Sequence, residues 1–299
     1  MLAVEPSLES SLDQAAGPAS EAETIVLPLT RAERRRSAGH DAGLSAKDLP
    51  LSLLFVRILM VAALAGLVVL AGWAHPIALA AAFAWAGAGV GWGWGQILDI
   101  TPGRRILGVV ALAGVLVATA VVIAGKDEPL RLVPIALAST VILTFLLQLV
   151  RRDGRAGLTD EVVATSGGLA FVGLGAGLVP MAVLNSGPEA LTVAMAGVAV
   201  SLVADAISAR LGPSVWALVM AAALGGLAGG TVGGLLGLPV WWHGVAVGAV
   251  SAVLSYAVRR LVEVRPGSMS LAGQIASACA SVLAVGALAQ VLVRIVVGV

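Results

Sequence analysis

The chain has 299 residues, of which 59% are hydrophobic and only 12% are charged, and its mean hydropathy is +1.00. Because a water-soluble domain carries about a quarter charged residues, this composition excludes a soluble globular protein. The formal net charge of +1 gives no basis for nucleic-acid binding, so we expect no nucleic-acid partner.

The first 49 residues differ from the rest of the chain. Acidic residues come first, from Glu5 to Glu23, and the basic segment RAERRRSAGH follows at 31–40. Ser, Ala, Gly and Pro fill the gaps, and no apolar period is visible. We therefore expect residues 1–49 to form a disordered cytoplasmic tail. The arginine cluster is expected to act as a topogenic signal, with binding to anionic lipid headgroups as the alternative.

From Leu51 onward, apolar segments recur at close to 20 residues, the length that crosses roughly 30 Å of hydrocarbon. We predict one transmembrane helical domain over residues 51–299. Its about nine spans are expected at approximately residues 51–73, 77–98, 106–125, 132–150, 162–184, 190–208, 215–237, 242–258 and 271–297.

Basic residues are distributed very unequally between the two sides of the predicted transmembrane domain. With the N-terminus inside, the cytoplasmic segments hold fourteen Lys and Arg residues and the outer segments hold three, namely Lys126, Arg131 and Arg294. The positive-inside rule then predicts a cytoplasmic N-terminus and an outer C-terminus. The expected fold class is an all-α polytopic integral membrane protein in contact with the lipid bilayer. A bias toward Arg, Ala, Val and Gly favours a bacterium with a GC-rich genome, and thus the cytoplasmic (inner) membrane.

Two predicted spans are unusually rich in glycine. The seventh reads LGGLAGGTVGGLLG and repeats glycine every four residues from Gly225 to Gly237. The second has the same four-residue glycine spacing, at Gly87, Gly91 and Gly95. A face almost free of side chains lets a neighbouring helix approach closely, so tight helix packing is the expected role. A partner helix, a homo-oligomer or a bending helix beside a substrate channel are the alternatives.

Asp205 is the most conspicuous carboxylate inside a predicted span, about one turn from the cytoplasmic end of the sixth. It either pairs with a nearby arginine such as Arg210 or has a role in binding a ligand, ion or proton. Arg57, in the first span, is expected to extend to the surface. Cys279 is the only cysteine, and His75 and His243 have no acidic or cysteine neighbours, so no metal site is predicted.

Three stretches carry a resemblance to a known family. They are LTDEVVATSGGLAFVGLGAGLVP (158–180), VSLVADAISARLG (200–212) and LPVWWHGVAVGAVSAVLSYAVRRLVE (238–263). In these stretches the chain resembles the membrane-embedded phosphatidate cytidylyltransferases, which make CDP-diacylglycerol from CTP and phosphatidic acid. The resemblance implies a helical membrane fold over most of residues 51–299. It puts Asp205 at the family's Asp-Thr-Gly motif and implies Mg²⁺-dependent chemistry at the cytoplasmic face.

The chain departs from the family at its catalytic signature. Ala206 and Ile207 follow Asp205 in place of Thr-Gly, and Ser268 and Met269 stand in place of a His-Gly-Gly segment. Nucleotidyl transfer needs Mg²⁺ ions that several carboxylates hold on the triphosphate. We therefore expect a degenerate relative without catalysis and without a cofactor, with Mg²⁺ required only if the cytidylyltransferase activity survives.

The leading hypothesis is that the protein binds a lipid headgroup at the cytoplasmic face. The candidate ligand-binding residues are Asp205, Arg210, Arg259 and Arg260. One alternative is a small-solute permease or exporter. Against it, no internal repeat relates two halves and no broken helix with central polar groups is evident, although Pro134 and Pro180 are expected to distort two spans. The other alternative is an accessory membrane subunit that docks a partner on its glycine stripes.

Overall fold

The computed structural model describes residues 51–100, 104–150, 158–211, 214–238 and 240–297. The chain divides into two units, residues 1–43 and 44–299, and all described residues belong to the second. The tail predicted for residues 1–49 lies outside the described residues.

All regular structure in the described residues is helical. The α-helices are α2 (Leu51–Ala74), α3 (Pro76–Ile97), α4 (Arg104–Ala124), α5 (Val133–Leu149), α6 (Leu158–Gly175), α7 (Gly187–Leu211), α8 (Val215–Leu235), α9 (Trp241–Glu263), α10 (Leu271–Leu283) and α11 (Val285–Val297). Two short 3₁₀ helices, η2 (Ala176–Ala182) and η3 (Pro266–Met269), interrupt the chain between them.

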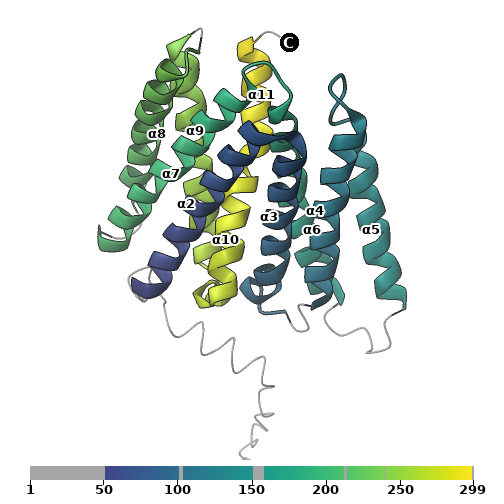
Figure 1. Cartoon of the computed structure of the whole chain (residues 1–299). Helices are drawn as coiled ribbons and strands as arrows, with labels where there is room; N and C mark the ends of the chain where they lie inside the picture. Colours follow the sequence, from purple (N-terminus) through teal and green to yellow (C-terminus); the bar gives the residue numbers. More distant parts are fainter. Residues whose placement is uncertain (1–50, 101–103, 151–157, 212–213, 239, 298–299) are drawn as a thin grey trace, which may run out of the picture. The chain divides into compact units, whose positions relative to one another are not determined.

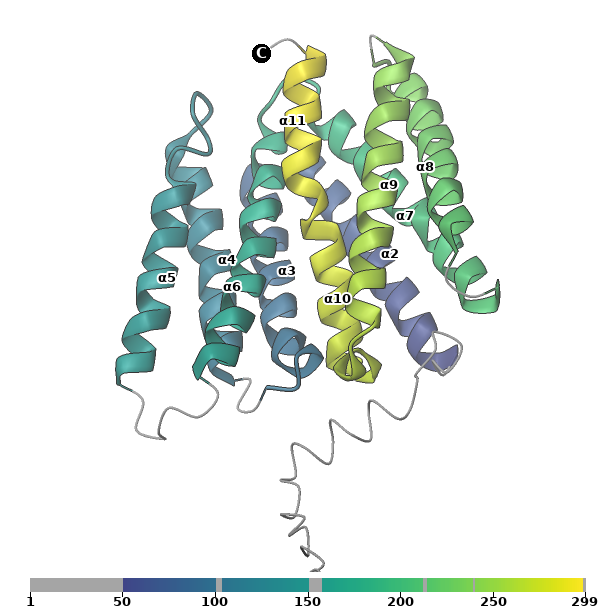
Figure 2. The same ribbon diagram turned by 180° about the vertical axis from the view of Figure 1, so that it is seen from behind.

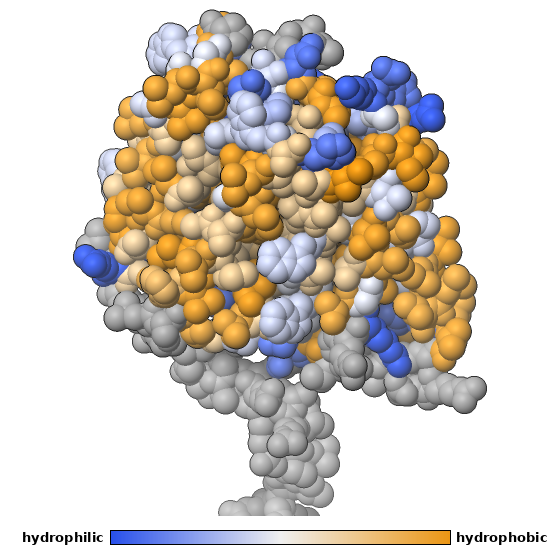
Figure 3. Space-filling view, viewed as in Figure 1, coloured by the Kyte–Doolittle hydropathy of each residue, from blue (hydrophilic) through white to orange (hydrophobic). Residues whose placement is uncertain are grey.

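Eight helical segments in the described part of the chain are long and apolar enough to cross a membrane. On the face seen in Figure 3, hydrophobic residues cover most of the middle, and the most hydrophilic residues lie toward the two ends. Together these observations support the predicted all-α, multi-pass membrane protein. The remaining predicted span corresponds to α5, which has only 17 residues. Turns and a bend occupy residues 125–132, and α5 starts at Val133 with Pro134 in its first turn.

The helices run between two ends of the bundle (Figure 1). At one end, α2, α4, α6, α8 and α10 begin and α3, α5, α7 and α9 end; we call it the basic end. Its described basic residues include Arg105, Arg210, Arg260 and Arg265. Helices α7, α8 and α9 pack together, α3 packs against α4 and α10, and α10 lies between the two groups (Figure 2).

The glycine stripe of α8 lies against α9 within the same chain. A Cβ added at Gly229 would overlap the carbonyl oxygen of Gly244, and one added at Gly248 would overlap the carbonyl oxygen of Gly225. Helix α7 joins this contact, because a Cβ at Gly197 would overlap the carbonyl oxygen of Gly248. The prediction of tight helix packing is confirmed. The close approach of α7 and α9 also determines which polar side chains meet farther along these helices.

Two of the spans are discontinuous, which differs from the sequence expectation. After Gly175, α6 tightens into η2, which contains Pro180, and the last span breaks at Ala284 between α10 and α11. The two interruptions pack on each other: a Cβ at Gly286 would lie 2.8 Å from the carbonyl oxygen of Leu174. Pro180 therefore distorts its span as predicted. The break at Ala284 has no proline to indicate it in the sequence.

Candidate functional site

An ion pair between α7 and α9 forms the centre of a buried polar cluster near the basic end. The Nε–H of Arg259 donates to Oδ2 of Asp205 at 2.6 Å. The side chains are 0% and 1% exposed, respectively. Both residues lie within apolar helices, where a single charge without a partner would be strongly unfavourable. The pair therefore holds α7 against α9 near the basic end of the bundle.

Three serines complete the surroundings of the Arg259 guanidinium. Its Nη1 donates to the Oγ atoms of Ser255 at 2.5 Å and Ser281 at 3.4 Å, and its Nη2 donates to Ser201 at 2.7 Å. Counting the bond to Asp205, four of its five N–H groups are directed at partners on α7, α9 and α10. This degree of satisfaction is what allows a guanidinium to remain charged and fully buried.

A second layer of charges lies one turn closer to the basic end. Glu263, the last residue of α9, accepts a hydrogen bond from Nη1 of Arg260 at 2.6 Å, and its Oε2 lies 3.5 Å from Nη1 of Arg57 on α2. The Nε–H of Arg260 donates to the hydroxyl of Tyr256 at 3.1 Å. That hydroxyl is also 2.8 Å from Oγ of Ser208 on α7. The layer thus connects α2, α7 and α9.

The charges of the two layers do not balance. Three guanidinium groups, on Arg57, Arg259 and Arg260, face two carboxylates, on Asp205 and Glu263, which leaves a formal charge of +1. Among the described residues, Nε of Arg57, Nη2 of Arg260 and Oδ1 of Asp205 are buried without a hydrogen-bond partner. Unpaired buried polar atoms are unfavourable, so the cluster has donors and net charge suited to an anion.

The structure brings together three of the four candidate residues predicted from sequence. Asp205 and Arg259 are in direct contact, and Arg260 is connected to the α7 side through Tyr256. Arg210 is exposed on the last turn of α7. The partner of Asp205 is therefore Arg259, and the pairing suggested with Arg210 is not what the structure has.

The prediction that the Arg57 side chain extends to the surface is wrong. Arg57 is only 2% exposed and lies against Glu263. Glu263 is the last residue of α9, and its side chain is 7% exposed. A signal for this cluster was present in the sequence, because Ser201 and Asp205, Ser255 and Arg259, and Tyr256 and Arg260 are each four residues apart, on one helical face.

The residues around Asp205 do not fit a magnesium–triphosphate site. Such a site needs several carboxylates whose oxygens converge on the metal. In the described part of the chain no three His, Cys, Asp or Glu side chains converge in this way, and Oδ2 of Asp205 is engaged by Arg259. The carboxylate acts here as a partner for a guanidinium.

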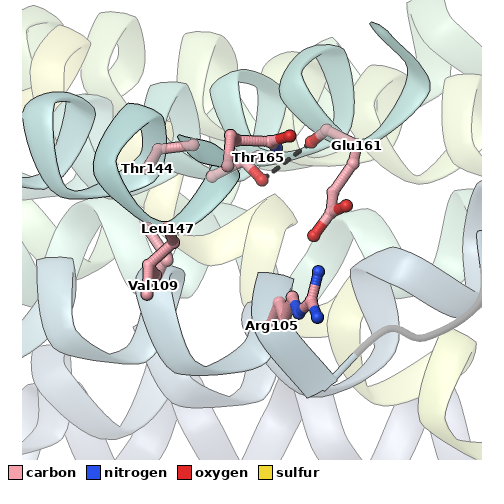
Figure 4. Close-up of a pocket in the computed structure, with 7 residues that line it drawn as sticks. Arg105, Val109, Thr144, Leu147, Glu161 and Thr165 are labelled. Carbon is pink, nitrogen blue, oxygen red and sulfur yellow. Dashed lines mark hydrogen bonds between the residues drawn. The ribbon is translucent and has the colours of Figure 1, made fainter. Parts of the chain in front are cut away.

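A second polar cluster lies between α4, α5 and α6, also near the basic end. Glu161 extends from α6 toward Arg105 on α4, and Thr144 and Thr165 lie beside them (Figure 4). The cavity that these side chains line has a volume of about 10 Å³, room for about one water molecule. Glu161 is buried in the first turn of α6.

Comparisons of the chain with family models, with curated proteins and with solved structures give no match. Interpretation of the cluster therefore depends on its own geometry and chemistry.

Proposed function

We propose that the protein binds the anionic, phosphate-bearing headgroup of a membrane lipid at the basic end of the bundle. The observation that carries the proposal is the excess positive charge of the Arg57, Arg260 and Glu263 layer together with the unpaired donors of its two arginines. A phosphate oxygen accepts charge-assisted hydrogen bonds from guanidinium groups and would neutralise the excess charge. The Arg260 side chain is 15% exposed, so a headgroup would reach the layer at this side chain.

In this proposal the Asp205–Arg259 pair has a positioning role. Arg259 and Arg260 are neighbours in the chain, and the pair fixes the last turns of α9 against α7. Arg210 is exposed near the same end and supplies long-range attraction for an anionic surface. Arg57 joins the candidate residues named from sequence, and Arg260 contacts the ligand directly.

Native mass spectrometry of the protein released from mixed micelles tests the proposal. We expect more phosphatidate than phosphatidylcholine to remain bound, and Arg57→Gln and Arg260→Gln each to reduce this preference about tenfold, since one charge-assisted bond contributes roughly 1.4 kcal/mol or more. Arg294→Gln, at an exposed position on α11, is the matched control and should leave the preference unchanged. Equal retention of both lipids by the unaltered protein would overturn the proposal.

We also propose that the chain is a divergent, non-catalytic relative of the phosphatidate cytidylyltransferases. Support comes from the three resembling stretches, from the helical membrane fold, and from the buried Asp205 at the position of the family's motif. The purified protein, incubated with CTP, Mg²⁺ and phosphatidic acid, should form no CDP-diacylglycerol. If the unaltered protein forms product and the Asp205→Asn variant does not, the family's chemistry survives on altered residues.

For the topology, we propose nine spans with α5 included, the basic end in the cytoplasm of a bacterial cell, and the C-terminus outside. The sorting of basic residues supports this orientation. The test uses two single-cysteine variants in a Cys279→Ala background. Asp127→Cys lies before α5, and Asp160→Cys lies after it. A membrane-impermeant maleimide should label the first from outside intact cells and the second only after permeabilisation. Labelling of both from the same side would mean that α5 does not cross.

A permease or exporter is the second candidate function, and the discontinuous spans favour it. Helices broken within the membrane, with freed backbone carbonyls, commonly form the binding sites of transporters. On α11, both amide atoms of Gln290 are buried without a partner among the described residues, and Oε1 would lie 3.0 Å from a Cβ at Gly177 of η2. If this function is right, a Gln290→Cys variant lacking Cys279 should react with impermeant thiol reagents from both sides. Reaction from neither side, or from one only, would exclude alternating access at this position.

The accessory-subunit hypothesis loses its main support. It required glycine stripes that are free to dock a partner, whereas Gly225 and Gly229 of α8 contact the backbone of α9 in the same chain, and Gly87 and Gly91 of α3 contact α4.

A further inference from the structure

An apolar groove lies between α2, α3 and α10, beside the charged layer. Its volume is about 390 Å³, which is in the range of small-molecule pockets. The lining includes Met60, Leu64, Trp85, Trp92, Ile275 and Cys279. The groove contains almost no polar surface, so its lining is complementary to a hydrocarbon group.

The groove extends along about two turns of α3. Ile275 lies four residues after the start of α10 and Trp92 five residues before the end of α3, so both are near the basic end. Trp85 lies seven residues deeper on α3, about 10 Å farther from that end at 1.5 Å per residue. The groove thus runs from the basic end toward the middle of the bundle, parallel to the direction in which acyl chains lie.

The groove and the charged layer are continuous along α2. Met60 is three residues and Leu64 seven residues after Arg57, so all three lie on one face of the helix. Arg57 contacts Glu263, and Glu263 contacts Arg260. Arg57 therefore lies about one turn from an apolar groove, and Arg260 is connected to it through Glu263. This combination matches the charge and shape of an anionic phospholipid.

We propose that the groove holds an acyl chain of the same anionic phospholipid whose phosphate is bound by Arg57 and Arg260. This inference rests on the proposed headgroup site and extends it, because it makes the ligand a lipid with a long acyl chain. A soluble phosphate compound would occupy only the charged layer.

Tryptophan fluorescence measures the occupant of the groove directly, because Trp85 and Trp92 line it. Bromine atoms on an acyl chain quench a tryptophan that they contact. The protein is reconstituted in phosphatidylcholine vesicles that contain a small, equal fraction of brominated phosphatidate or brominated phosphatidylcholine. The contribution of Trp92 is the difference between the unaltered protein and Trp92→Phe. We expect brominated phosphatidate to quench this contribution several-fold more strongly than brominated phosphatidylcholine.

Matched variants separate the groove from the headgroup site. Ala63 lines the groove, and its exposed neighbour Ala62 does not, so Ala63→Phe fills the groove while Ala62→Phe is the control. We expect Ala63→Phe to abolish the preferential quenching and Ala62→Phe to preserve it. Arg57→Gln should abolish the preference as well, because the lipid is no longer held by its phosphate.

The outcomes of the two experiments are distinguishable. Retention of phosphatidate in the mass spectrometer, combined with equal quenching by the two brominated lipids, would overturn the groove assignment and leave the headgroup site intact. Absence of any preference for phosphatidate in both measurements would overturn the headgroup site and the groove assignment together. Preferential quenching that survives Ala63→Phe would mean that the acyl chain lies elsewhere.

Discussion

Removing the carboxylate of Asp205 should destabilise the protein far more than the loss of one hydrogen bond. In Asp205→Asn, the Arg259 guanidinium keeps its serine partners but loses the negative charge that lies 2.6 Å from it in a site with almost no solvent access. Breaking a buried ion pair from one side typically reduces the free energy of unfolding by about 3–5 kcal/mol. That loss corresponds to a change of at least about a hundredfold in the unfolding equilibrium.

The measurement is unfolding in detergent micelles, with increasing denaturing detergent, followed by circular dichroism and tryptophan fluorescence. The matched control is Glu128→Gln, since Glu128 and Arg131 form an ion pair at 3.9 Å whose side chains are about two-thirds exposed. An exposed pair contributes about 0–1 kcal/mol, so this variant should unfold close to the unaltered protein.

A double-mutant cycle strengthens the test. Arg259→Gln leaves Asp205 buried without its cation, and the double variant carries neither charge of this pair. The double variant should therefore lose about 1–3 kcal/mol less than the sum of the two single losses. A loss of stability in Asp205→Asn no larger than that in Glu128→Gln, or single losses that simply add, would contradict a directly coupled buried ion pair.

Three further changes test the packing and the polar cluster, each measured by the same unfolding transition. Gly248→Leu should reduce stability by about 1–3 kcal/mol or prevent folding, because its Cβ would overlap the carbonyl oxygen of Gly225. Gly234→Leu is the control and should be tolerated, since no atom lies within 4 Å of a Cβ at that position. Tyr256→Phe should cost about 1–3 kcal/mol because its hydroxyl bonds both Ser208 and Arg260, and an unchanged midpoint would show that the hydroxyl is not part of the network. Gln290→Leu should raise stability by about 1–2 kcal/mol because it removes a buried amide without partners, and a loss of stability would mean that the amide is satisfied.

Asp205 could be identified from the sequence because a carboxylate is rare among the apolar residues of a membrane helix. The residues that surround it could not. Serines are common in transmembrane helices. The four-residue spacing of Ser201 from Asp205 and of Ser255 from Arg259 puts each serine on the same helical face as a charged residue, but it does not show that the two faces meet. Arg57 was misjudged for the same reason, since a long side chain near a helix end usually reaches water. Its burial depends on Glu263, which lies on another helix.

By itself, the sequence determined that the chain forms apolar helices of membrane-spanning length and that its basic residues gather at one end of them. These properties are local: the hydrocarbon requires each helix to satisfy its own backbone and to reach across the bilayer. Only the tertiary structure decided that Asp205 pairs with Arg259, 54 residues away, and not with Arg210, five residues away. The reason is the contact of α7 with α9 at Gly197 and Gly248, which brings two distant helical faces together.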